Sequence, residues 1–142
     1  MIRAAQATDA ELVRLLFREY GAGLGVDLSF QDFDAEVADP LGVYEIVLVA
    51  RGGCVALRRI DEATCEMKRL YVRPEARGSG LGRRLAQAIV AVGRSRGYRR
   101  MLLDTLPTMT SARALYASLG FREIEPYRYN PVAGTTFLQL VL

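Results

Sequence analysis

The segment Arg77-Gly78-Ser79-Gly80-Leu81-Gly82 has the residue types that bind phosphate. Three glycines alternate over five positions, so the backbone can approach an anion closely and point successive N–H groups at it. The apolar stripe that follows predicts a helix over Gly80–Arg96, whose positive dipole end would add to the attraction. Arg77, Arg83 and Arg84 add mobile positive charge. The alternative is a tight turn that needs its glycines for steric reasons only.

Two nucleotide-binding patterns fail on spacing. A P-loop requires a lysine after its last glycine, and no lysine follows here. A dinucleotide fingerprint requires GxGxxG, whereas this loop reads GxGxG and places Arg83 where the third glycine would stand. The loop therefore indicates a phosphate-bearing ligand of another kind.

The composition limits the chemistry further. The chain has no histidine, which excludes Ser-His-Asp and Cys-His nucleophilic sites, and two cysteines are too few for a structural zinc site. We therefore expect no metal. The net charge of +3 is a mild excess that does not indicate nucleic-acid binding, for which a dense basic face is expected.

The length of 142 residues fits a single domain, 1–142, with a real core. No apolar stretch reaches the roughly 18 to 20 residues that span a bilayer, so we expect no membrane association. The first residues, Met1–Ala5, lack the apolar region of a signal peptide. We therefore expect a cytoplasmic protein.

The elements that must position the loop follow from periodicity and turn signals. An antiparallel meander is expected to feed a β-α-β crossover, which predicts an α/β fold with a mixed sheet. Predicted strands are Ile2–Ala5, Glu45–Arg51, Cys54–Ile60, Thr64–Val72, Met101–Thr105, Phe121–Ile124 and Thr135–Leu142; predicted helices are Asp9–Tyr20, Phe33–Ala38, Gly80–Arg96 and Ser111–Leu119.

Several local details are also predicted. Thr8 and Glu11 form a capping box for the first helix. A break in the helical structure is predicted at Pro40, after the second helix. The second and third strands of the meander turn near Glu62, which places Cys65 opposite Arg59 and Cys54 near Leu70, too far from Cys65 for a disulfide. The apolar final strand, taken as an open edge, predicts a homodimer.

Three segments resemble the GCN5-related N-acetyltransferase (GNAT) family. Arg77-x-x-Gly80-x-Gly82 resembles its acyl-CoA loop. Leu70-Tyr71-Val72-x-Pro74-Glu75 looks like the strand and turn before that loop, and Ala112-x-x-Leu115-Tyr116-x-x-x-Gly120-Phe121 is similar to the late helix and the following strand. The resemblance covers about residues 45–124 in the family's order.

The resemblance implies that the fourth and fifth strands splay at a bulge and that the pantetheine of acetyl-CoA, the expected co-substrate, lies in the gap. The backbone of Leu70 and Val72 would pair with it, and an N–H near Leu70 or Tyr71 would polarise the thioester carbonyl. Thr110 or Ser111 would replace a family asparagine. Residues implied to hold the pyrophosphate are Arg77, Gly78, Ser79, Gly80, Leu81, Gly82 and Arg83.

The resemblance also implies direct attack by a primary amine. Tyr116 matches the family's general acid for the departing thiolate, with a Tyr packed at a helix end as the alternative. Glu66 stands where several members carry a general base; an exposed strand glutamate paired with Lys68 or an arginine is the alternative. A non-catalytic acyl-CoA-binding module is a further possibility.

The acceptor site would come from Gly21–Tyr44, Glu66–Arg69 and the aromatic, polar segment Tyr127–Pro131. Lys68, Arg69 and Arg128 are candidates for binding a carboxylate, although they also suit an ordinary charged surface. We expect a small-molecule amine rather than a protein lysine, because no extended peptide-docking strand is evident.

Overall fold

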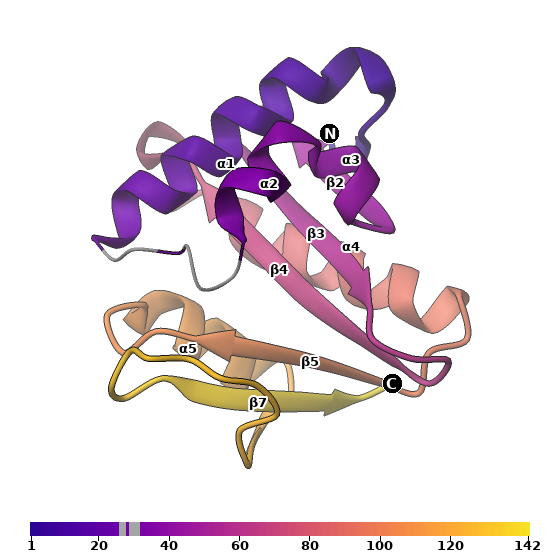
Figure 1. Cartoon of the computed structure of the whole chain (residues 1–142), viewed down its shortest axis with the longest axis vertical. Coiled ribbons are helices and arrows are strands. Elements are labelled where there is room, and N and C mark those ends of the chain that lie inside the picture. Colours follow the sequence, from indigo (N-terminus) through magenta and orange to yellow (C-terminus); the bar gives the residue numbers. More distant parts are fainter. Residues whose placement is uncertain (26–27, 29–31) are drawn as a thin grey trace.

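The computed structural model describes residues 1–25, 28 and 32–142. They form a seven-stranded mixed sheet of order β1-β2-β3-β4-β5-β7-β6 (Figure 1). The strands are β1 (Arg3–Ala4), β2 (Ile46–Ala50), β3 (Gly53–Arg59), β4 (Thr64–Val72), β5 (Arg100–Thr105), β6 (Arg122–Ile124) and β7 (Thr136–Val141). The helices are α1 (Ala10–Leu24), α2 (Phe33–Ala38), α3 (Pro40–Val43), α4 (Leu81–Ser95) and α5 (Thr110–Ser118), with 3-10 turns at Ala7–Asp9 and Pro74–Ala76.

The predicted fold class and topology are confirmed. Strands β1 to β4 pair antiparallel, and α4 carries the chain over to β5, which pairs parallel with β4. The apolar stripe of α4, including Leu85 and Ile89, packs on one face of the sheet together with Tyr116 of α5. On the other face, Val13 and Phe17 of α1 form a second core with α2 and β2.

The sheet opens between β4 and β5. The two strands pair at three positions only, the last being Glu66 with Leu102. On its other side β4 carries a bulge, because Ala56 pairs with Lys68 and Cys54 with Tyr71. The bulge includes Arg69, whose φ of 58° is left-handed. The expected splay and bulge are therefore present.

One prediction about the first helix needs correction. Helix α1 begins at Ala10 without a Thr8–Glu11 capping box; instead, the Asp9 carboxylate accepts a hydrogen bond from the Gln6 N–H at 2.8 Å. The predicted break at Pro40 is confirmed, because α2 ends at Ala38, and Pro40 then begins a new helix, α3, at a first position that needs no N–H donor.

The predicted strand register was correct at Cys65 and differs by one residue at Cys54. Cys65 pairs with Arg59 as expected, and Cys54 pairs with Tyr71, one residue beyond the predicted neighbour Leu70. The shift arises because the bulge inserts one residue into β4. Both thiols are buried and free.

The argument for a dimer through an open final strand was wrong. Strand β7 lies between β5 and β6 and pairs with both, so β6 forms the edge. The homodimer stays a prediction without that support. Within the described ranges, no helix is both long and apolar enough to cross a membrane.

Candidate functional site

A groove of about 580 Å³ follows the opening between the strands. Its walls come from the end of β4, the glycine-rich loop, the start of α5 and the end of α1. Ser79 is the one predicted donor-site residue that does not line it; the Ser79 hydroxyl instead donates to the Ala76 carbonyl at 2.7 Å. The predicted residues that do line it are Leu70, Tyr71, Val72, Arg77, Gly78, Gly80, Leu81, Gly82, Arg83 and Ser111.

The loop is built around two left-handed glycines. Gly78 and Gly80 both have a φ of 82°, a conformation that L side chains rarely adopt. The Arg77 Nε donates to the Val72 carbonyl at 3.0 Å and ties the loop to the end of β4. The left-handed backbone explains why Gly78 and Gly80 are glycines, but it does not explain Gly82.

Gly82 is not required by the fold. It lies inside α4 without a left-handed φ, and an added Cβ would meet no atom closer than the Val72 Cγ2 at 3.6 Å. A side chain is therefore compatible with the protein alone. Because Gly82 lines the groove, we infer that its bare backbone leaves room for a ligand, which fits a phosphate group at the start of α4.

The end of α1 also lines the groove. Gly23 and Leu24 belong to the segment Gly21–Tyr44 that was predicted for the acceptor site, whereas Tyr20 and Met109 were not predicted. The apolar spacing of α1 predicted a helix with a buried stripe, but such spacing does not indicate which end of the helix borders a gap in the sheet. The start of α5 carried a signal, since Thr110 and Ser111 were predicted contacts and both line the groove.

A smaller polar cavity of about 30 Å³ adjoins the groove. The two share Tyr20, Leu24, Leu70 and Met109 as wall residues, so they lie side by side. The small cavity also has polar and titratable walls, contributed by Lys68, Arg69, Asp104, Tyr116 and Asn130.

Tyr116 is packed in the core, as the structural alternative predicts, and its role as an acid stays a prediction. Its ring packs at 5.7 Å from the Phe121 ring, and it also lines the small cavity. Burial raises the pKa of its hydroxyl well above the usual 10, with smaller effects from the nearby Tyr20 and Asp104. Tyr116 therefore keeps its proton at neutral and mildly alkaline pH and is available as a donor.

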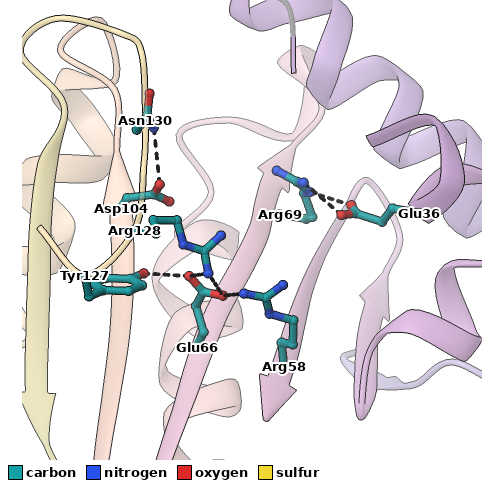
Figure 2. A network of polar contacts seen from close by, with 8 residues as sticks. All are labelled: Glu36, Arg58, Glu66, Arg69, Asp104, Tyr127, Arg128 and Asn130. Atoms are coloured by element: carbon teal, nitrogen blue, oxygen red, sulfur yellow. Dashed lines mark hydrogen bonds and ion pairs between the residues drawn. The ribbon is translucent and has the colours of Figure 1, made fainter. Parts of the chain in front are cut away.

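Glu66 is not the exposed glutamate of the alternative interpretation. It is completely buried and is held by three side chains (Figure 2). The Tyr127 hydroxyl and the Arg128 guanidinium each donate to it at 2.6 Å, and the Arg58 guanidinium lies at 2.9 Å. The predicted pairing with an arginine is confirmed, and the contacts pin the segment after β6 to β4.

Arg69 and Arg128 are both engaged inside the protein. Arg69 makes two contacts with the Glu36 carboxylate, at 2.5 and 2.8 Å, and its guanidinium lies 5.1 Å from the Phe33 ring. Arg128 is held by Glu66 as described. Their guanidinium groups thus serve internal ion pairs, and Lys68 lines the small cavity as the third predicted cation.

Comparison with known proteins identifies the family. The model of the acetyltransferase (GNAT) family matches residues 11–121. An uncharacterized N-acetyltransferase of Schizosaccharomyces pombe is 42% identical over 143 positions, which cover 93% of this chain and 88% of that protein. The chain therefore belongs to the acetyltransferase (GNAT) family, as its motifs indicated, and it is an acyltransferase.

Solved structures share the fold. An acetyltransferase from Streptococcus agalactiae matches with a TM-score of 0.79 at 21% identity, covering 100% of this chain and 98% of that one. A GNAT family acetyltransferase from Elizabethkingia anophelis, with acetyl-CoA bound, matches with a TM-score of 0.67 at 19% identity, covering 100% and 97%.

Lys68 should make stability depend on pH. Burial lowers its pKa from 10.5 to about 8, so between those values the unfolded chain binds more protons and stability rises with pH. Relative to Lys68→Met, the free energy of unfolding of the wild type should increase by roughly 2 kcal/mol from pH 7.5 to 9.5. Urea unfolding at several pH values measures this; a constant or falling difference would contradict it.

Proposed function

We propose that this chain transfers an acetyl group from acetyl-CoA to the primary amine of a small molecule. The observation that carries the proposal is the adjacency of two cavities that share four wall residues. A groove beside the glycine-rich loop lies next to a small polar cavity that Tyr116 lines, and their junction at Leu70 lies beyond the last pairing of β4 with β5. A thioester at that junction would face both an acid and an incoming amine.

The walls of the groove offer groups that suit the parts of acetyl-CoA, the acetyl donor. Beyond Glu66 the backbone of β4 no longer pairs with β5, so the backbone of Leu70 and the N–H of Val72 are available for the pantetheine amides, while the Val72 carbonyl already accepts from the Arg77 Nε. The backbone N–H groups from Gly78 to Arg83 and the start of α4 would hold the pyrophosphate. Ser111 lines the opposite wall and offers a hydroxyl to the pantetheine.

Tyr116 is the proposed general acid. The amine attacks the thioester carbon, and an N–H near Leu70 or Tyr71 stabilises the oxyanion. When the C–S bond breaks, the phenol of Tyr116 gives its proton to the coenzyme A thiolate. Its raised pKa keeps that proton in place beforehand.

Glu66 was expected as a possible general base, and its contacts favour a different role. Both of its oxygens accept charge-assisted or phenolic hydrogen bonds, and no part of it is exposed. A carboxylate in this state has little freedom to reach a water or an amine. We propose that Glu66 positions Tyr127 and Arg128 beside the small cavity.

The polar cavity has a volume of about 30 Å³, so it admits only the amine-bearing end of an acceptor. The proposal of a small-molecule acceptor rests on the sequence, in which no extended peptide-docking strand is evident. Incubation with acetyl-CoA and a panel of amino acids, polyamines and aminoglycosides, read by release of free thiol, tests the proposal. Acetyl-CoA binding without thiol release from any amine or from lysine peptides would favour a non-catalytic binding module.

Gly82→Ala should separate ligand binding from folding. Because the added methyl group meets no protein atom within 3.4 Å, and because alanine favours a helix over glycine by about 1 kcal/mol, thermal stability should stay equal or rise. Acetyl-CoA affinity, measured by calorimetry, should fall at least about tenfold, a change of about 1.4 kcal/mol. Gln87→Ala, at an exposed position of the same helix, is the matched control. Unchanged affinity in Gly82→Ala would argue against this placement of the phosphates.

Tyr116→Phe should lower turnover and spare donor binding. The substitution removes the proposed acid but keeps the packing against Phe121, so kcat with the best acceptor should drop on the order of 100-fold. The affinity for acetyl-CoA should change less than about twofold, since Tyr116 lines the small cavity and does not line the groove proposed for acetyl-CoA. Full activity across the pH range would rule out the acid role.

A further inference from the structure

Two carboxylates lie on the same face of the sheet on either side of the opening. Side chains alternate along a strand, and Met67 of β4 and Leu103 of β5 belong to the core on the α4 side. Glu66 and Asp104 therefore point to the opposite face, which α1 covers. Figure 2 shows Glu66 on one side of the opening and Asp104 across it.

The two carboxylates differ in how their oxygens are used. Glu66 accepts contacts from three side chains and is fully buried. Asp104 accepts one side-chain hydrogen bond among the described residues, from the Asn130 amide at 3.3 Å, and it stays partly exposed. Asp104 thus has oxygen lone pairs that face the cavity it lines.

The negative charge of Asp104 reaches the groups around the cavity. It contributes to the raised pKa of Tyr116, after burial and Tyr20, and it partly opposes the effect of burial on Lys68. The titratable and charged groups that face it are Lys68 from β4, Tyr20 from α1, Tyr116 from α5, and Tyr127 with Arg128 from the segment after β6. Tyr116, from the α4 side of the sheet, and Asp104, from the opposite side, both line the one small cavity at the opening.

We propose that Asp104 binds the ammonium group of the acceptor and takes its proton as the reaction begins. The inference rests on the acetyl transfer proposed above. One proton passes from the ammonium to the Asp104 carboxylate, and the free amine then forms the new N–C bond. As the C–S bond breaks, the thiolate takes the Tyr116 proton; the nitrogen returns a proton to Tyr116, and Asp104 releases its own to solvent.

This assignment defines a class of acceptor. A carboxylate selects a cation, whereas the guanidinium groups of Arg69 and Arg128 already hold Glu36 and Glu66. The other walls of the cavity include apolar side chains such as Leu24 and Leu106. The preferred acceptor is thus a basic alkylamine that is protonated in solution, rather than an arylamine, which is neutral at pH 7.

Asp104→Asn tests this with the shape of the side chain preserved. With the best alkylamine, kcat/KM should fall on the order of 100-fold, while acetyl-CoA affinity and melting temperature stay within error of the wild type. The pH profile should also change: the rate of the variant should rise with the fraction of unprotonated amine in solution, because no carboxylate takes the proton. The Asp104→Asn variant should also lack the preference for alkylamines over arylamines that the wild type shows.

Two further variants make the outcome decisive. Glu66→Gln should raise KM for the acceptor but keep the wild-type pH profile, and Glu62→Gln, exposed in the turn before β4, should change neither. If Asp104→Asn retains the wild-type rate and profile, or if Glu66→Gln alone shifts the profile, the inference is overturned while acetyl transfer stands. If the wild type acetylates no amine, the proposed function itself fails, and this inference with it.

Discussion

The separation of β4 from β5 after Glu66 is the constraint on which the rest of the site depends. It accompanies a bulge that holds Arg69 in a left-handed conformation, which costs a non-glycine residue about 1 to 2 kcal/mol. The two contacts from Arg69 to buried Glu36, and the rings of Tyr20 and Phe33 beside its guanidinium, offset that cost. The opening is therefore a built feature of the fold.

Buried ion pairs hold both flanks of the opening. Glu36 of α2 binds Arg69 on one side, and Glu66 binds Arg128 on the other (Figure 2). Removing one partner from such a pair typically costs about 3 to 5 kcal/mol, because a buried charge is left uncompensated. The carboxylates of Glu36 and Glu66 thus shape the cavity walls. Asp104, which has fewer side-chain contacts, is the carboxylate that we propose contacts the substrate.

Much of the fold could be predicted from the sequence because its signals are local. The apolar stripe gave α4 nearly to the residue, and the glycine spacing located the groove. The side-chain environment of the site could not be predicted this way. Glu66 meets Arg128 across 62 positions and Arg69 meets Glu36 across 33, and no local pattern records such contacts. The role of Asp104 in lining the cavity likewise depends on where β5 ends its pairing with β4.

Hydrogen–deuterium exchange of the chain with and without acetyl-CoA tests the central claim most directly. If the donor lies in the opening between the strands, the amides of Leu70 and Val72 and those from Gly78 to Arg83 should exchange more slowly when it is bound. The paired part of the sheet, such as β2 with β3, should change little. Protection that is absent from the β4 end and the loop, or confined to another surface, would contradict the account.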